Sequence, residues 1–210
     1  MNFLRKQFRY SNSNLVFVLI GINILVYLAE IFLRQLPVYI FLSLIPSLVM
    51  RGWLWQFVTY MFVHDPQSYM HIIFNMLALF IFGTQVERQM GSREFLLYYL
   101  LTGILAGFFS FVVYYLTGSM LVVLMGASGA VFAVQLAYAV LYPRSVVYIW
   151  GLLPLRAPIM VLGFTAVELV SMIAGFGGNI AHLTHLAGFA IGWVYFLLRF
   201  GINPWRAMRS

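Results

Sequence analysis

Polar side chains that could carry out chemistry lie in three otherwise apolar stretches of this sequence. Ser128, in the run Met-Gly-Ala-Ser-Gly-Ala at 125–130, can act as a nucleophile. A second stretch holds His182 and His185, whose imidazoles can accept a proton. A third holds His71 and Asn75, whose side chains can donate hydrogen bonds. Strongly polar groups are costly in a membrane and by default mark a functional site there, so the pattern predicts an active site built inside a membrane.

The composition predicts that these stretches belong to membrane helices. Hydrophobic residues make up 63% of the 210 residues and charged residues only 8%, against roughly 25% charged in an average soluble domain. The apolar residues come in blocks that reach or approach the ~20 residues needed to cross a bilayer. We therefore expect spans near 14–33, 68–84, 95–116, 123–141, 157–175 and 180–199.

The expected fold class is an all-α membrane protein, a bundle of six transmembrane helices. One membrane domain is expected at 14–199, between a short N-terminal segment at 1–13 and a short C-terminal tail at 200–210. The first span is too long for the apolar core of a signal peptide, and no small-residue cleavage site follows it before Glu30. We therefore interpret it as a membrane helix.

The connection at 34–67 differs from the other predicted loops because it is long and rich in apolar residues. Pro37, Pro46 and Gly52 interrupt it, so it cannot be a further span. Non-helical backbone at membrane depth must be covered by protein. We expect a partly membrane-embedded external loop that lies against the helices.

The positive charges predict the orientation of the bundle. Of the twelve lysine and arginine residues, all except Arg34 and Arg51 fall at the two termini or in the second and fourth loops, on one side of a six-span bundle. By the positive-inside rule both termini are expected in the cytoplasm. The net charge of +7 then reflects this topology and the attraction of anionic membrane lipids, and no nucleic-acid partner is expected.

The second, fourth and sixth helices all run inward from the outer face under this topology. At ~1.5 Å per residue, Asn75, Ser128 and His185 are expected roughly 8–11 Å below that face, with His71 about one turn higher. The three helices would then present their polar groups at one level.

Small residues accompany two of these polar groups. Gly188 and Gly192 lie on the same face of the sixth helix as His185. Gly129 and Ala133 show the same four-residue spacing on the fourth helix. Small residues at this spacing allow two membrane helices to approach closely, which would bring the serine hydroxyl to the imidazole.

Three short motifs follow one another on the second, fourth and sixth expected helices. Residues 71–75 read HxxxN, residues 126–129 read GxSG, and residues 185–192 read HxxGxxxG. In this order they resemble the motifs of the rhomboid family of intramembrane serine proteases, of the prokaryotic six-helix type. The resemblance runs from about residue 14 to residue 199. Gln56, after Trp55 of the external loop, stands where many members carry arginine, which puts the bonding of that loop in doubt.

The resemblance implies a Ser-His dyad without a third carboxylate. Ser128 would attack the scissile carbonyl and His185 would take its proton. The Ser128 backbone N–H, with the side chains of His71 and Asn75, would stabilise the oxyanion. The remaining implied residues line the substrate pocket or pack the two helices together: Gly126, Gly129, Phe132, Gly188 and Gly192. A ring at Phe132 can stack on the catalytic imidazole.

The resemblance also implies the substrates and the location of the protein. Single-pass transmembrane proteins would be cut near their outer ends by an integral, multi-pass protein of a prokaryotic plasma (inner) membrane. No cofactor is implied. We expect no metal either, because the four histidines lack an H-E-x-x-H pair or a fitting carboxylate and the chain has no cysteine.

Two other histidines and one acidic residue have more modest interpretations. His182 lies one turn above His185 and is read as a residue of the site's rim, and His64 as a hydrogen-bonding residue of the external loop. Glu168 lies well inside a predicted span, where we favour a neutral or hydrogen-bonded group over a mechanistic one.

Two alternative functions remain at this point. Glu168 could serve a small proton-coupled permease, but the sequence has no internal repeat and no matched pair of broken helices. A catalytically inactive relative that only binds membrane clients is the other alternative. The intact Ser128, His185, His71 and Asn75 argue against it.

Overall fold

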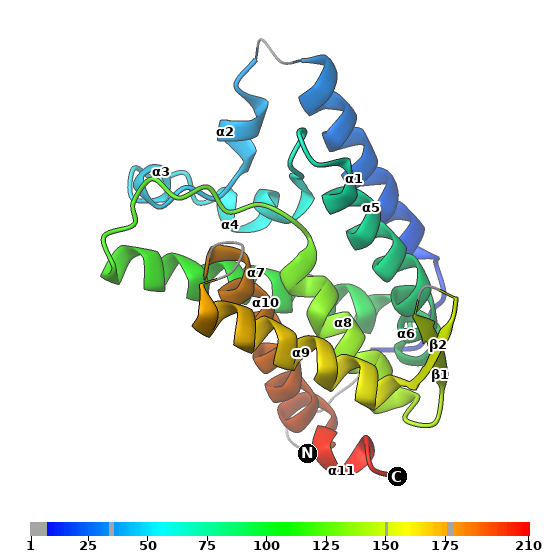
Figure 1. The fold of residues 1–210 in the computed structure, drawn as a ribbon. Coiled ribbons are helices and arrows are strands. Elements are labelled where there is room, and N and C mark those ends of the chain that lie inside the picture. The colour runs from blue at the N-terminus through cyan, green and yellow to red at the C-terminus, as the bar shows by residue number, and fades with distance from the viewer. Residues whose placement is uncertain (1–7, 34–35, 150, 176–178) are drawn as a thin grey trace.

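The computed structural model describes residues 8–33, 36–149, 151–175 and 179–210, without the side chains of 179–181. Within these residues, five helices are long and apolar enough to cross a membrane, and Figure 1 shows how they pack. They begin within a few residues of five of the predicted spans. They comprise α1 (Leu15–Phe32), α5–η3–α6 (Tyr69–Ala78, Leu79–Gly83, Thr84–Met90), α7 (Ser92–Leu116), α9 (Ala157–Ala174) and α10–η4 (Asn179–Tyr195, Phe196–Phe200).

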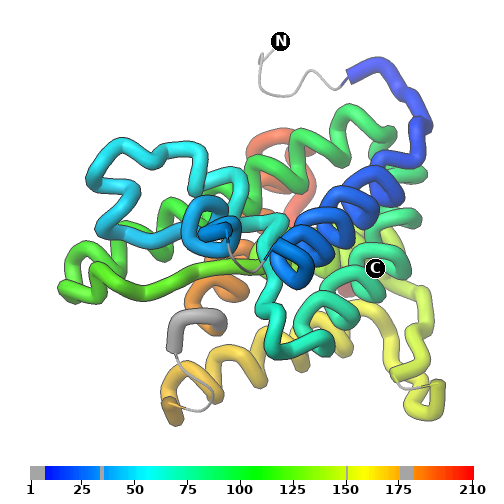
Figure 2. Tube along the Cα trace, turned by 90° about the horizontal axis from the view of Figure 1, so that it is seen from above, coloured from blue at the N-terminus to red at the C-terminus, as the bar shows by residue number. Residues whose placement is uncertain are grey.

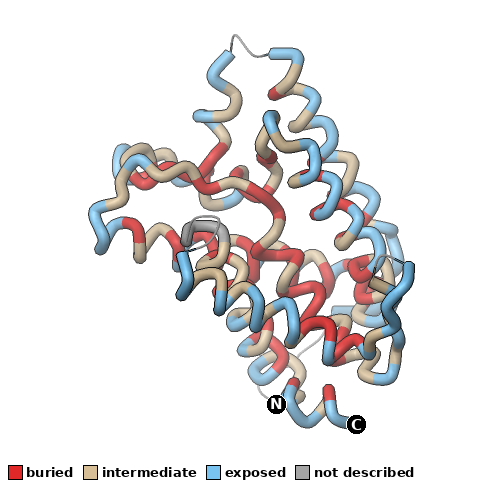
Figure 3. Tube along the Cα trace, viewed as in Figure 1, coloured by how far each residue is buried: buried red, intermediate tan, exposed pale blue. Residues whose placement is uncertain are grey.

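A shorter apolar helix, α8 (Ser128–Leu141), lies at the centre of the molecule. The prediction that a helix begins at 123 is wrong, because α8 starts five residues later, at Ser128. Ten of its 14 residues are buried, and Figure 3 shows this burial in the middle of the chain trace. At 14 residues α8 is shorter than the ~20 that a span needs, so the number of six spans remains a prediction.

The outer helices have the opposite distribution of burial. Large apolar side chains are exposed along α1, α5, α7 and α9, for example Leu25, Ile73, Phe108 and Val167. Exposed apolar surface of this extent is found on membrane proteins and at interaction sites rather than on soluble monomers. The molecule therefore has an extensive apolar exterior, as an integral, multi-pass membrane protein requires.

The external connection folds into short helices rather than an irregular loop. They are α2 (Val38–Leu42), α3 (Pro46–Val49), α4 (Gln56–Thr59) and the 3₁₀ turn η2 (Tyr60–Phe62). Gln56 is fully buried, and its side chain accepts a hydrogen bond from the Ile45 N–H and donates one to the Ile40 carbonyl. An amide at this position therefore bonds the loop to itself.

Residues 117–127 lead to α8 through turns and an irregular segment instead of entering a helix at 123. Leu124 forms an antiparallel bridge with Leu44, through two backbone hydrogen bonds of 2.9 Å. The N–H of Gly126 donates to the Tyr60 carbonyl at 2.9 Å. Figure 2 shows this segment and the loop helices on one side of the bundle, opposite the β-hairpin. The loop thereby fixes the backbone that leads into α8.

A two-stranded antiparallel hairpin, β1 (Val146–Ile149) with β2 (Leu153–Arg156), precedes α9. An all-α prediction does not include it. The chain ends in the short helix α11 (Pro204–Ala207). Near this end, Arg199 binds both carboxylate oxygens of Glu94 at 2.7 and 2.8 Å, which joins α10–η4 to the start of α7.

Candidate active site

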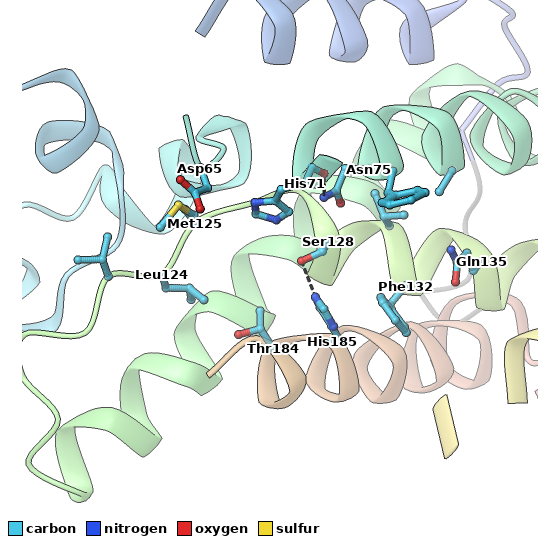
Figure 4. Close-up of a pocket in the computed structure, with 14 residues that line it drawn as sticks. Asp65, His71, Asn75, Leu124, Met125, Ser128, Phe132, Gln135, Thr184 and His185 are labelled. Carbon is cyan, nitrogen blue, oxygen red and sulfur yellow. Dashed lines mark hydrogen bonds between the residues drawn. The ribbon is translucent and has the colours of Figure 1, made fainter. Parts of the chain in front are cut away.

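Ser128 and His185 meet where the first turn of α8 touches α10. The Ser128 Oγ lies 2.7 Å from the His185 Nε2, within the hydrogen-bonding range expected of a nucleophile and its base. Figure 4 shows this contact as a dashed line. The two residues are 57 positions apart in sequence, so only the packing of α8 on α10 brings them together.

Glycines allow this packing to be close. A Cβ added to Gly188 would overlap the carbonyl oxygen of Gly129 on the facing helix. One turn further along α10, a Cβ on Gly192 would lie 2.5 Å from the Tyr98 hydroxyl and 3.1 Å from the Ala133 Cβ. The structure thus places all these small residues at the contact between α8 and α10, where larger side chains would push the helices apart.

The ring of Phe132 fixes the plane of the His185 imidazole. The two ring centroids are 4.5 Å apart and the planes are inclined by only 10°. Phe132 follows Ser128 by one helical turn, so one face of α8 presents both Ser128 and the ring that stacks on His185.

His71 and Asn75 approach Ser128 from α5, on the side opposite His185 (Figure 4). Gly126 lies between them and the nucleophile with φ +113°, and a Cβ there would lie 2.9 Å from the His71 Nε2. Asn75 is almost fully buried and donates one amide hydrogen to the His71 carbonyl at 2.8 Å. The second hydrogen of that amide is available to a group bound beside Ser128.

A cavity of about 620 Å³ joins these groups. Its lining includes all four polar residues on which the sequence analysis rests: Ser128, His185, His71 and Asn75. It also includes Asp65, Met125, Gln135 and Thr184, for which the sequence predicted no role in the site. Gln135 could have been found from its spacing, because it follows Ser128 by seven residues and so shares its helix face.

Comparison with known proteins agrees with this geometry. Residues 51–202, most of the chain, match the Rhomboid domain. The chain belongs to the rhomboid family.

Several rhomboid proteins are similar to this chain over most of its length. Rhomboid protease GlpG of Haemophilus influenzae is 26% identical over 203 residues, which cover 90% of this chain and 93% of that protein. Rhomboid protease GluP of Bacillus subtilis is 32% identical over 147 residues, 68% of this chain and 25% of that protein. Rhomboid-like protein 11, chloroplastic, of Arabidopsis thaliana is 32% identical over 193 residues, 86% of this chain and 63% of that protein.

In this rhomboid family member, a carboxylate from α9 reaches His185. One oxygen of Glu168 lies 2.5 Å from the Nδ1 of His182 and 3.0 Å from the Nδ1 of His185. The first contact is a hydrogen bond. The second has a hydrogen-bonding distance but lacks the alignment of a full hydrogen bond. Glu168 is therefore hydrogen-bonded, as the sequence predicted. Its partners, His182 and His185, lie at the candidate site.

Within the part of the chain that the structure describes, Glu168, His182 and His185 form a group that could hold a metal ion, since their donor atoms lie within 4.8 Å of one another. The expectation that no fitting carboxylate exists was wrong, because Glu168 lies beside two histidines. Two ligands on one tetrahedral zinc ion lie about 3.3 Å apart, given bonds of about 2.0–2.1 Å. The 2.5 Å separation of Glu168 and His182 is shorter, and it fits a hydrogen-bonded cluster.

The two remaining histidines differ in their surroundings. His182 is partly buried one turn from His185, with ring centroids 6.5 Å apart. His64 is fully buried in the external connection and its ring lies 5.0 Å from that of His71. Burial, with a smaller contribution from His71, lowers the pKa of His64 to about 4, so its ring is neutral at physiological pH. His64 is therefore a neutral, buried ring packed beside His71.

Proposed function

We propose that this protein is an intramembrane serine endopeptidase that cleaves transmembrane segments of other membrane proteins through a Ser128–His185 dyad. The observation that carries the proposal is the 2.7 Å contact between the Ser128 hydroxyl and the His185 Nε2, inside a cavity formed by apolar helices. The names of its relatives, among them rhomboid proteases GlpG and GluP, support the same reaction class.

The reaction proceeds by two acyl transfers. The Ser128 Oγ attacks the scissile carbonyl carbon while its proton passes to the His185 Nε2. When the C–N bond breaks, His185 returns that proton to the leaving amine, and an acyl-enzyme remains. A water molecule then attacks the ester carbonyl, with His185 again as base, and regenerates the serine.

The developing oxyanion is stabilised on the opposite side of Ser128. Its donors are the Ser128 backbone N–H at the start of α8 and the side chains of His71 and Asn75. Such donors act strongly in a site of low dielectric constant, and the loss of one typically lowers the rate by ~10²–10³. The positive end of the α8 dipole adds to this stabilisation.

The substrates are single-pass transmembrane helices, cut near their outer ends in the inner membrane of a prokaryote, with both termini of the enzyme cytoplasmic. A helical peptide bond is shielded by its own backbone hydrogen bonds. The cleaved segment must therefore unwind, which favours sites with small residues and weak helix propensity.

Substrates reach Ser128 between α5 and α9. A second cavity of about 520 Å³ lies between these helices, and it shares Phe74, Ala78, Phe132 and Gln135 with the catalytic cavity. Gly175, with φ +72°, ends α9. Displacement of α9 would join the two cavities to the lipid. Passage past the external connection is the alternative route.

The permease alternative is no longer supported, because the one observation in its favour was the unexplained carboxylate of Glu168. Glu168 contacts His182 and His185, so its presence follows from the proposed active site. No separate proton pathway is needed to explain it.

The proposal is tested with purified protein in detergent and a panel of model transmembrane substrates. We expect cleavage by the native protein and none by Ser128→Ala or His185→Ala. Ser110→Ala is a matched control, because Ser110 is a fully buried serine beside the site that bonds Thr184 and not His185. Cleavage that survives Ser128→Ala, or no cleavage of any substrate by the native protein, would refute the proposal.

A further inference from the structure

Glu168 occupies a position that a dyad mechanism does not require. It lies on α9, and its carboxylate projects toward α10, where one oxygen faces the Nδ1 atoms of two histidines. Its side chain is only 16% exposed. An acidic group inside a membrane helix is expensive unless it is paired, and by default it has a function.

The contact with His185 is on the ring nitrogen that the dyad leaves unused. Nε2 faces the Ser128 hydroxyl at 2.7 Å, and Nδ1 faces Glu168 at 3.0 Å. A neutral imidazole carries its proton on one nitrogen only. A carboxylate at Nδ1 favours the tautomer with the proton there, which leaves Nε2 bare and able to accept the serine proton.

We propose, on the basis of the proposed function, that Glu168 is a positioning residue for His185 and makes the dyad a Ser-His-Glu arrangement. Glu168 accepts a hydrogen bond from the Nδ1–H of His185, fixes its tautomer, and stabilises the imidazolium that forms when Ser128 attacks. The carboxylate stays ionised throughout, and no proton is transferred to it. The serine proton passes to Nε2 and from there to the leaving amine.

His182 holds this carboxylate in place. Its Nδ1 bonds the same Glu168 oxygen at 2.5 Å, and it precedes His185 by three residues on α10, so both imidazoles share one side of that helix. The stacking of Phe132 fixes the plane of His185, and the carboxylate fixes its tautomer. The imperfect alignment at His185 is that of a resting site, since catalytic hydrogen bonds often tighten only when substrate is bound.

The test is the reactivity of Ser128 in Glu168→Gln, which keeps the size of the side chain and removes its charge. We expect kcat for a transmembrane substrate to fall at least ~10-fold, with KM changed less than ~2-fold. Labelling of Ser128 by a small fluorophosphonate should slow by a similar factor. This probe reacts with an activated serine and does not require a substrate helix to unwind. Its labelling rate therefore measures the reactivity of Ser128 independently of substrate entry.

The histidine tautomer gives a readout that a merely structural residue would not move. The chain has four histidines, so their ¹⁵N signals can be assigned with single variants. In native protein we expect His185 in the Nδ1–H form, and in Glu168→Gln a mixture of tautomers. Glu168→Asp should restore labelling in part, and His182→Ala should retain more activity than Glu168→Gln.

Thr165→Val is the matched control, because it removes a polar group from α9 one turn away, where the Thr165 hydroxyl donates to the Val161 carbonyl of its own helix. It should label at the native rate. If Glu168→Gln lowers the melting temperature but leaves labelling, kcat and tautomer at native values, Glu168 only ties α9 to α10 and the inference is overturned. If native protein is not labelled at Ser128 at all, the proposed function itself fails.

Discussion

At the scale of single residues, two buried asparagines make the same local hydrogen bond in different surroundings. Asn75 donates to the His71 carbonyl at 2.8 Å and Asn23 to the Leu19 carbonyl at 2.7 Å, each four residues back along its helix. Asn75 lines the catalytic cavity and Asn23 does not. The pair therefore separates a role in catalysis from a role in helix stability.

We predict that Asn75→Ala lowers kcat by ~10²–10³, because it removes an oxyanion donor, while KM changes little. Asn23→Ala should lower the melting temperature about as much and leave kcat within ~2-fold. Steady-state kinetics on a transmembrane substrate, with melting curves for both variants, measure this. Equal losses of kcat in the two variants would show that Asn75 acts through stability alone.

His64 gives a prediction for pH. Its pKa is lowered by burial from 6.5 to about 4, so the unfolded state binds a proton that the folded state does not over that window. The stability it contributes is fully present above pH 6.5 and is lost as the pH falls toward 4. The loss is on the order of 3 kcal/mol, because a tenfold difference in proton affinity between the two states corresponds to ~1.4 kcal/mol.

The measurement is the melting temperature between pH 7 and pH 4 for native protein and His64→Gln. The glutamine variant does not titrate, so it should lose less stability over this range than native protein. Glu30 lies near His64 and is present in both proteins, so only the difference between the two curves tests the prediction. Parallel curves would contradict it.

At the scale of elements, the contact between α8 and α10 determines whether a site forms. Gly188 has no room for a methyl group, which would overlap the backbone of Gly129. We predict that Gly188→Ala lowers the free energy of unfolding by about 1–3 kcal/mol through overpacking. It should also slow fluorophosphonate labelling of Ser128, because the two helices must separate.

Gly163→Ala is the control for this prediction, since Gly163 lies on α9 with nothing within 4 Å of an added Cβ. Alanine there should stabilise the helix by about 0.5–1 kcal/mol and leave labelling unchanged. Melting curves and labelling rates are compared for the two variants. Native-like labelling in Gly188→Ala would mean that the glycine contact does not position the dyad.

At the scale of the whole molecule, movement of α9 relative to α5 controls substrate passage in our proposal. The chain has no cysteine, so Leu77→Cys with Phe164→Cys introduces one defined pair across the cavity between these helices. After cross-linking with a short bifunctional reagent, we expect cleavage of a transmembrane substrate to stop and hydrolysis of a small soluble ester to continue. Unchanged transmembrane cleavage in fully cross-linked protein would exclude this route in favour of passage past the external connection.

The sequence by itself determined the class of this molecule and most residues of its candidate site. Apolar blocks must be helical in lipid because backbone groups find no water there, so five long helices were predictable from composition. The motifs around Ser128, His185, His71 and Asn75 were recognisable because their chemistry depends on residue type at fixed helical spacing. The same periodicity pointed to Gly188 and Gly129 as small residues for a close contact.

Only the tertiary structure decided where α8 begins and which residues Glu168 contacts. Residues 123–127 are as apolar as a helix, but backbone pairing of Leu124 with Leu44 and of Gly126 with Tyr60 keeps this segment out of the helix. Those partners lie more than 60 residues away, and hydropathy contains no information about them. In the sequence, Glu168 is a single charged residue within an apolar segment. Its partners become apparent only when α10 places the imidazoles of His182 and His185 opposite it. Local periodicity fixes which side chains share a face, and long-range packing fixes which faces meet.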